Sequence, residues 1–370
     1  MHRIYSLDVL RGLAIFIMIL VDAPPDLEKI YPILVHASWA GLTLADLAFP
    51  GFVFAMGMSA AVSMARRDPS TRKILKRAAI LFALGILFNI MPYLWALLLW
   101  DNFTGAEFFN QAIIQLRVFG ILQRLALTYL FAMLLIRAIK NDAGILIAAF
   151  ALLILSSAGY HIYAPDNPFA QEHNISRAVD YIFPGVNHIY EEFNDPEGLY
   201  GTFASVASML FGFLAGRNLI DRANQRDKIF LLIAAGAIFL IAGGVWSQFD
   251  IIAKRLWTAP FALITTAIEI FFLLAITYLH DKIPKSKKFL QPLCAIGMNP
   301  LFFFLLSNIM LNFFRILQVD GTGIYFLAYE NIFEHLISPA FGATIFCLLW
   351  TLSWLPLAEI LYRLKVVIKI

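Results

Sequence analysis

The sequence is poor in charged residues and in cysteine. Only 14% of its 370 residues are Asp, Glu, Lys or Arg, and only two are cysteine. A soluble domain carries about 25% charged residues, so this composition excludes an ordinary soluble globular protein. The formal net charge of +3 gives no reason to expect a nucleic acid partner. Cys294 and Cys347 lie in apolar stretches, which predicts two buried thiols and no disulfide framework. We predict no metal site.

The chain is instead rich in long apolar runs. Hydrophobic residues make up 61% of it, and the mean hydropathy is +0.76. A helix needs about 20 predominantly apolar residues to cross a bilayer. Runs of about that length lie at 9–23, 42–64, 78–100, 118–139, 143–164, 200–220, 229–249, 257–279, 290–314 and 339–362. The predicted fold is therefore all-α, a polytopic membrane helical bundle of about ten transmembrane helices in one domain (1–370), with the lipid bilayer around it.

The first of these runs is not followed by a small-residue cleavage site. We therefore expect a retained helix and no signal peptide.

Lys and Arg are distributed unevenly between the two ends of these runs. Twenty of the 28 basic residues fall on one side and six on the other, while Arg11 and Arg124 lie within the runs. Because cytoplasmic loops carry the excess of Lys and Arg, this bias places both termini in the cytoplasm of a multi-pass inner-membrane protein. It also leaves a polar, aromatic loop at about 165–199 on the extracytoplasmic side, where we expect it to be folded over the helix ends.

Ionisable residues at membrane depth are costly and indicate functional sites. Here the set is Asp8, Arg11, Asp22, Asp46, Arg124, Glu269 and Glu359. Asp8 and Arg11 are three residues apart, so they can pair on one helical face. A structural ion pair and a ligand contact are equally good interpretations of that pair. Glu269 lies mid-helix and should face protein or water.

The segment from His36 to Asp46, HASWAGLTLAD, holds the densest chemistry in the chain. It leads from the extracytoplasmic side into the second helix, so His36 should lie near the outer mouth. Trp39 suits the membrane interface, and Asp46 favours the first turn of the helix, where its charge meets the helix dipole. Pro50-Gly51 should then distort the helix and free backbone groups toward a cavity. Without the surrounding motif, the better interpretation of His36 is an exposed interfacial histidine with no chemical role.

Two further irregularities occur at membrane depth. Gly297-Met-Asn-Pro300 should break the ninth helix and place the Asn299 amide there. Gln123 and Arg124 come early in the fourth helix. A buried Arg124 requires a carboxylate, a group of carbonyls or an anionic ligand.

Five sequence blocks occur in a familiar order: SLDVLRGLAIFIMILVD, HASWAGLTLADLAFPGFVFAMG, GILQRLALTY, DPEGLYGT and GMNP. Together they resemble the conserved blocks of the heparan-α-glucosaminide N-acetyltransferase family and its bacterial relatives, sometimes named N-acetylglucosamine-operon membrane proteins. The likeness extends over nearly the whole transmembrane chain. Because the sequence begins almost at the first run, we expect the luminal N-terminal domain of that family to be absent.

The resemblance implies a transmembrane acyltransferase in which cytoplasmic acetyl-CoA is the acyl donor. The acceptor would be a small-molecule amino sugar, of glucosamine type, on the extracytoplasmic side. The family's active histidine corresponds to His36. Asp22 is expected to be its catalytic partner, at a position where the family often has asparagine. A neutral imidazole can attack a thioester or take the proton of an amine, and both roles remain open.

The remaining site residues are divided between donor and acceptor. Arg124, Gln123 and Asn299 are expected near acetyl-CoA, and Trp39 and Asp46 near the amino sugar. The alternative function is an amino-sugar transporter, since broken helices and buried charge suit a transporter equally well. The acceptor's identity remains open, and so does the oligomeric state, a homodimer included.

Overall fold

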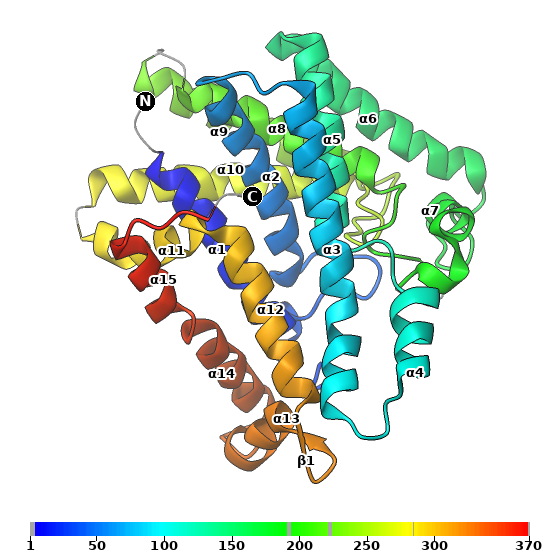
Figure 1. Ribbon diagram of the computed structural model, residues 1–370. Helices are drawn as coiled ribbons and strands as arrows, with labels where there is room; N and C mark the ends of the chain where they lie inside the picture. Colours follow the sequence, from blue (N-terminus) through cyan, green and yellow to red (C-terminus); the bar gives the residue numbers. More distant parts are fainter. Residues whose placement is uncertain (1–3, 191–193, 221–223, 284, 369–370) are drawn as a thin grey trace.

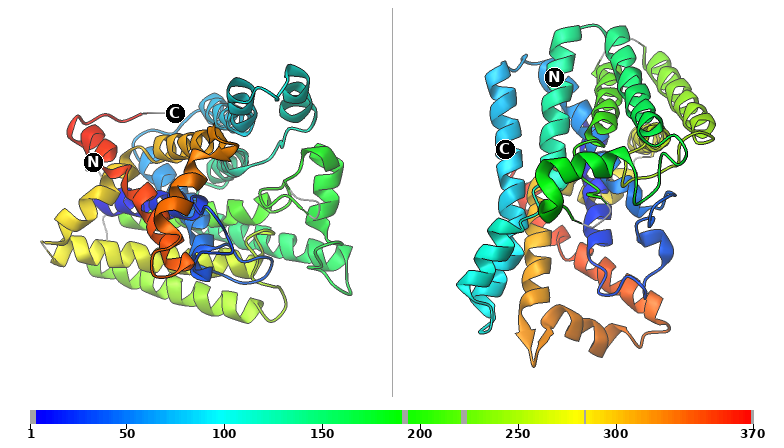
Figure 2. Two further views of the ribbon diagram at one scale, coloured as in Figure 1. Left: turned by 90° about the horizontal axis from the view of Figure 1, so that it is seen from below. Right: turned by 90° about the vertical axis from the view of Figure 1, so that its right-hand side faces the viewer.

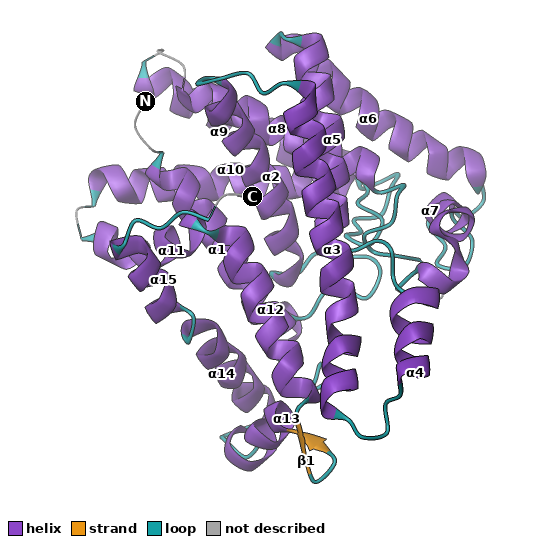
Figure 3. Cartoon of the chain, viewed as in Figure 1, coloured by secondary structure: helices purple, strands orange, loops and turns teal. Residues whose placement is uncertain are grey.

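The structure is a computed structural model, described here for residues 4–190, 194–220, 224–283 and 285–368. Of the basic residues counted above, Arg3, Arg222 and Lys369 lie outside these ranges. Helices form nearly all of the regular structure, which confirms the all-α prediction (Figure 3). The long helices are α1 (Tyr5–Asp22), α2 (Ala48–Met64), α3 (Thr71–Leu99), α5 (Ile121–Ile139), α6 (Asp142–Tyr163), α8 (Thr202–Ile220), α9 (Gln225–Trp246), α10 (Ala259–Lys282), α11 (Ser286–Met298), α12 (Pro300–Ile316), α14 (Pro339–Leu352) and α15 (Leu355–Arg363).

Short helices occupy the connections between them. These are η1 (Pro32–Leu34), η2 (Ala45–Leu47), α4 (Gly105–Phe109), η3 (Asn110–Ile114), α7 (Ile175–Asp180), η4 (Tyr181–Gly185), η5 (Val186–His188), α13 (Ile324–Ala328) and η6 (Tyr329–Phe333). One antiparallel hairpin joins β1 (Gln318–Val319) to β2 (Thr322–Gly323). Asp320 and Gly321 both have positive φ at its tip, which a two-residue turn of this hand requires. Figure 1 labels the larger elements, and the two views of Figure 2 show that the long helices run in different directions and cross one another at oblique angles.

The membrane character predicted from the sequence is confirmed. In the described ranges, eight helices are long and apolar enough to cross a bilayer, or nine if α11 and α12 together form one span. The one predicted run not counted among these spans, at 9–23, corresponds to α1, which is 18 residues long but carries Asp8, Arg11 and Asp22. The predicted pair of Asp8 and Arg11 is present as an ion pair within α1.

The predicted break near Asn299 is also confirmed, and it is sharper than a kink. The axes of α11 and α12 differ by 81°, and Asn299 has φ −131° and ψ 53° between them. Pro300 has no N–H, so it starts a new helix well and cannot continue the old one. The run at 290–314 is therefore two helices in different directions.

Close helix crossings depend on glycine at two places. In the crossing of α2 with α8, a Cβ on Gly57 would lie 2.1 Å from the Met209 carbonyl oxygen, and one on Gly212 2.1 Å from that of Phe54. Gly12 of α1 and Gly297 of α11 make the same kind of reciprocal crossing. Small residues let membrane helices approach at backbone distance, where dispersion contacts are densest. These crossings fix α2 against α8 and α1 against α11.

Contacts among the connections agree with the predicted alternation of sides. On the basic side, the Arg137 guanidinium donates to the Thr71 hydroxyl (2.8 Å), and Arg217 pairs with Asp142 (2.6 Å). On the opposite side, Lys29 pairs with Glu334 (2.8 Å), and the Trp100 indole donates to the Ile316 carbonyl (2.8 Å). Each contact joins connections that the sequence assigns to the same side. The assignment of the basic side to the cytoplasm stays a prediction.

Candidate active site

The site is formed where the connection between α1 and α2 meets the connection between α9 and α10. Gly41 has φ +127°, a conformation that side chains disfavour, and its N–H donates to the Ile252 carbonyl (2.7 Å). Trp39 lies in the same segment, and its indole N–H donates to the Phe169 carbonyl (2.9 Å). The segment is therefore held to two other outer loops, the one at 165–199 and the one at 247–258.

His36 is paired with Asp46 within this segment. The distance from Nδ1 of the imidazole to Oδ1 of the carboxylate is 2.9 Å. The side chain of His36 is 41% exposed, whereas that of Asp46 is 0% exposed. A carboxylate accepts hydrogen bonds, so we assign the ring proton to Nδ1. In this tautomer Nε2 carries the ring's basic lone pair, which the carboxylate does not engage.

Asp46 is held rigidly by its own neighbours. Its second oxygen accepts from the backbone N–H of Ala37 (3.2 Å) and from both the N–H (3.0 Å) and the hydroxyl (3.0 Å) of Thr43. The Thr43 hydroxyl also lies 2.8 Å from the Val35 carbonyl oxygen. Every contact fixes the carboxylate toward His36, so Asp46 orients the imidazole and is not open to a ligand. The sequence analysis had expected it near the acceptor sugar.

Lys254 is the residue of this site that the sequence analysis did not identify. Its ammonium nitrogen lies 3.1 Å from each ring nitrogen of His36 and 4.0 Å from the Asp46 carboxylate. Because the in-plane directions of the two ring nitrogens diverge, a group equidistant from both nitrogens lies over the face of the ring. Burial lowers the pKa of Lys254, although Glu197 and Asp46 act in the opposite direction. The only sequence signal was its membership in the small basic set outside the membrane.

Asp22 lies nearby but contacts other groups. Its carboxylate accepts from the Asn308 amide (3.2 Å), and its backbone carbonyl accepts from Arg315 (3.1 Å). It is within electrostatic range of His36 and Lys254. The direct partner of His36 is therefore Asp46, and Asp22 contributes negative charge from the end of α1.

Arg124 and Gln123 belong to a different buried cluster. Arg124 is 1% exposed, and its Nη2 donates to the Gly198 carbonyl (2.7 Å), which is one of the partners that the sequence allows. Its guanidinium also lies over the Trp257 ring, 5.4 Å from the centroid. Gln123 fills the space beside Gly85, where a Cβ would lie 2.4 Å from the amide oxygen. Both residues anchor the outer loop and α3.

A buried ion-pair network joins the loop that holds Gly198 to the connection between η3 and α5. Arg117 donates to Asp195 from Nε (2.9 Å) and Nη2 (2.6 Å), and also to Glu197. Burial disfavours the Glu197 carboxylate, but the positive charges of Arg117, Arg124 and Lys254 together outweigh burial and lower the pKa of Glu197. Burial raises the pKa of Asp180 to about 7, against the hydrogen bond from the Asp195 N–H. The network confirms that the loop is folded, and Glu197 extends its negative charge toward Lys254.

Asn299, between α11 and α12, lines a cavity of about 430 Å³ that α2 also lines, from Phe52 to Ser63. Its amide donates to the Val366 carbonyl (3.0 Å), and its carbonyl accepts from the Ile368 N–H (2.7 Å). In Figure 1 the C-terminal segment runs from α15 back toward the start of α12. The polar lining comprises Arg11, Ser59, Ser63, Arg77 and Asn299. The structure thus separates Asn299 from Arg124 and Gln123, which were expected together.

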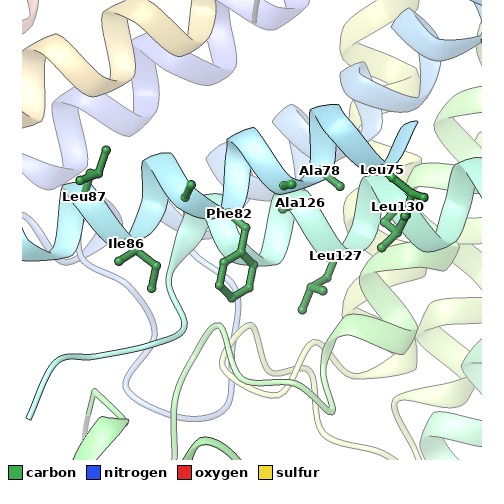
Figure 4. Close-up of a pocket in the computed structure, with 10 residues that line it drawn as sticks. Leu75, Ala78, Phe82, Ile86, Leu87, Ala126, Leu127 and Leu130 are labelled. Atoms are coloured by element: carbon green, nitrogen blue, oxygen red, sulfur yellow. The ribbon is translucent and has the colours of Figure 1, made fainter. Parts of the chain in front are cut away.

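A larger cavity, of about 740 Å³, lies elsewhere, between α3 and α5. Figure 4 shows that its lining side chains are aliphatic or aromatic, among them Phe82, Ile86 and Leu127. A groove without polar groups cannot orient a polar reactant. This cavity is therefore not a candidate for the acyl-transfer site, although it is larger than the one beside Asn299.

Comparison with known proteins bears on this arrangement. Residues 3–239 match the family model described as "Heparan-alpha-glucosaminide N-acetyltransferase, catalytic". This chain belongs to that family. Two relatives, each named heparan-alpha-glucosaminide N-acetyltransferase, are similar along the whole chain. The Mus musculus protein is 26% identical over 431 residues, and the Homo sapiens protein is 25% identical over 429 residues. The alignments cover 100% of this chain but 61% and 60% of those proteins, so the chain spans about three fifths of their length.

The family match includes the segment that carries His36 and Asp46, together with Arg124 and Glu197. It ends before Lys254 and Asn299. The resemblance inferred from the five sequence blocks is confirmed at the level of the family.

Proposed function

We propose that this protein is a transmembrane N-acetyltransferase that transfers an acetyl group from cytoplasmic acetyl-CoA to the amine of an amino sugar on the extracytoplasmic side of the inner membrane. Membership of the acetyltransferase family supports the reaction class. The observation that carries the proposal is the His36–Asp46 pair, because it fixes a partly exposed imidazole through Nδ1 and leaves the lone pair of Nε2 available for chemistry.

The proposed chemistry starts from the orientation of that ring. With Nδ1–H held by Asp46, Nε2 either attacks the thioester carbonyl or takes the proton from the incoming amine. Asp46 stabilises the positive charge that develops on the imidazole in both cases, as the aspartate of a Ser-His-Asp triad does. The Lys254 ammonium, 3.1 Å from the ring, supplies positive charge beside the oxyanion that forms from the carbonyl.

The cavity beside Asn299 fits the phosphate end of acetyl-CoA. It presents two guanidinium groups, from Arg11 and Arg77, together with the hydroxyls of Ser59 and Ser63. Nε of Arg11 is buried and has no hydrogen-bond partner in the structure, so it has capacity for a further acceptor. Arginine and hydroxyl donors are the groups that bind phosphate.

The helix α2 connects this cavity to the imidazole. The cavity's lining includes Phe52, six residues from Asp46 and so about 9 Å along α2. An extended pantetheine arm beside α2 would carry the thioester from the basic end toward His36. This arrangement supports entry of acetyl-CoA from the side that carries most of the Lys and Arg.

The donor site is tested by replacing Arg77. Arg77→Ala should raise the KM for acetyl-CoA about tenfold, since a charge-assisted hydrogen bond contributes about 1.5–3 kcal/mol. Arg72→Ala, one turn earlier on the exposed start of α3, is the matched control and should leave KM unchanged. Equal KM values for the Arg77 and Arg72 variants would place the phosphates elsewhere.

The function itself is tested in proteoliposomes with acetyl-CoA on one side and glucosamine on the other. We expect N-acetylglucosamine to appear on the glucosamine side, in the orientation that has both termini on the acetyl-CoA side. Passage of glucosamine without acetylation would instead establish the transporter. A requirement for both reactants on the same side would refute transfer across the membrane.

A further inference from the structure

We infer that Lys254 is a self-acetylation site: in the absence of an amino sugar, its side-chain amine takes the acetyl group at His36. The inference rests on the proposed function, because the acetyl group must first reach the imidazole. It assigns to Lys254 the position that the acceptor amine would otherwise occupy.

Proximity is the first reason. The Lys254 nitrogen lies 3.1 Å from Nε2 of His36, within the range in which reacting atoms of a well-oriented pair are found. Its side chain is only 15% exposed, so the amine is held beside the ring and not released into solvent. Such a fixed amine reacts as if it were present at very high concentration.

Direction is the second reason. An acetyl group on Nε2 is conjugated with the imidazole and lies in its plane, so a nucleophile must approach its carbonyl carbon from above or below. Lys254 is equidistant from the two ring nitrogens and therefore lies over the ring face. The amine is already on the side from which attack occurs.

The protonation state of the amine is the third reason, because only a neutral amine attacks. Burial lowers the pKa of Lys254, against the negative charges of Glu197, Asp46 and Asp22 and together with the positive charge of Arg255. Its neutral fraction is thus larger than that of a free lysine side chain at the same pH. Lys29, by contrast, has its pKa raised by its hydrogen bond to Glu334.

The reaction balances without another reagent. The thioester C–S bond breaks as the acetyl group bonds to Nε2 of His36, and the Nε2–C bond then breaks as the bond to the Lys254 nitrogen forms. One proton leaves that nitrogen, and one proton is taken up by the CoA thiolate. The products are acetyl-Lys254, neutral His36 and free CoA.

The test uses the full chain in proteoliposomes with isotopically labelled acetyl-CoA and no acceptor, followed by peptide mass spectrometry. Label at Lys254 should exceed label at Lys29 by at least about tenfold, because Lys29 reports the uncatalysed background. His36→Ala should reduce label at Lys254 by at least about 100-fold and leave Lys29 unchanged. Saturating glucosamine should suppress label at Lys254 in the unmodified protein.

The outcomes separate the two proposals. Turnover of glucosamine with no label at Lys254 would overturn the inference and leave the proposed function standing. Equal label at Lys254 in the His36→Ala protein would also overturn the inference, since the acetyl group would then arrive without the imidazole. Neither turnover nor label would refute both, provided that the protein still binds CoA.

Discussion

Among the residues that the structure describes, two His–Asp pairs are nearly equal in exposure and distance. Nδ1 of His36 lies 2.9 Å from Asp46, with side chains 41% and 0% exposed. Nε2 of His161 lies 2.8 Å from Asp250, with side chains 42% and 1% exposed. Burial and pairing alone therefore do not distinguish a reactive histidine from a structural one.

The difference lies in which ring nitrogen is engaged and in how the aspartate is held. His36 uses Nδ1 and leaves Nε2, the tip of the ring, free to react. His161 uses the tip to hold Asp250 and packs edge-on to Phe169, with ring centroids 5.6 Å apart. Both oxygens of Asp46 accept hydrogen bonds, whereas Oδ2 of Asp250 has no partner in the structure. Only the first pair combines a fixed carboxylate with a free nitrogen.

Replacing each histidine tests this distinction with the largest expected effect. His36→Ala should lower acetyl transfer by roughly 10²–10⁴-fold or more, because it removes the base or nucleophile. His161→Ala, the matched control, should stay within about threefold of the unmodified protein. Initial rates with glucosamine measure both, and CoA binding confirms that the variants are folded. Similar losses in the two variants would erase the distinction.

Replacing the two aspartates by asparagine tests the tautomer. Asp46→Asn should lower kcat by up to about 10⁴-fold, as the corresponding change does in a Ser-His-Asp triad, because an amide permits the wrong tautomer. Asp250→Asn should have little effect on kcat. Should Asp46→Asn retain normal kcat while Asp22→Asn loses it, the catalytic partner would be Asp22, as the sequence analysis expected.

The loop at 247–258 supplies Asp250 to the second pair and places Lys254 beside the first, so loosening it should affect both moderately. The Thr258 hydroxyl accepts from the Ala253 N–H (3.1 Å) and donates to the Ile251 carbonyl (2.7 Å), which closes the loop that carries Asp250 and Lys254. Thr258→Val leaves that buried N–H without a partner and should destabilise the protein by about 1–3 kcal/mol. Thermal unfolding measures the loss. Ser247→Ala, at the start of the loop, should leave the melting temperature nearly unchanged.

The smallest expected effect is on how the stability of the protein depends on pH. It arises from Lys254, which lies beside the His36–Asp46 pair and has no counterpart in the description of the His161–Asp250 pair. Because the pKa of Lys254 is lowered in the folded protein, the unfolded chain binds more protons between that pKa and the ordinary value. Stability should therefore rise with pH in that window, by at most about 1.4 kcal/mol per pH unit. Lys254→Met should flatten this dependence, measured by unfolding between neutral pH and the ordinary lysine pKa.

Lys29 provides the control of opposite sign. Its pKa is raised by Glu334, so its contribution to stability is lost as pH rises through the folded value. Lys29→Met should remove a small decrease in stability at alkaline pH. A flat profile for the unmodified protein, unchanged by Lys254→Met, would contradict the described environment of Lys254.

Much of the site could be predicted from the sequence, but its pairing could not. His36 follows from its motif, and the break at Asn299 follows from Gly297 and Pro300. Asp22 and Asp46 are 14 and 10 residues from His36, so both are within reach along the chain. The path of the connecting loop decides between them, because the bond from Gly41 to Ile252 turns the segment back onto Asp46.

The partner of Arg124 also could not be predicted from the sequence. The sequence requires a carboxylate, a carbonyl group or an anionic ligand for it, and the resemblance favoured the ligand, acetyl-CoA. The structure provides the Gly198 carbonyl, from a loop 74 residues later. Several kinds of partner can satisfy a buried guanidinium, and the sequence does not distinguish among them. The folded loop supplies the one that Arg124 contacts.

The sequence by itself determined the helical membrane fold, the family and the choice of His36 as the candidate catalytic residue. Apolar run length, the cost of charge in lipid and a contiguous motif are local properties that require no knowledge of packing. The tertiary structure alone decided that Asp46 orients His36, that Lys254 joins them from 218 residues away, and that Asn299 lies in a separate cavity. These depend on how loops cross the ends of the bundle, which is set by long-range hydrogen bonds and glycine-mediated helix crossings that no local pattern contains.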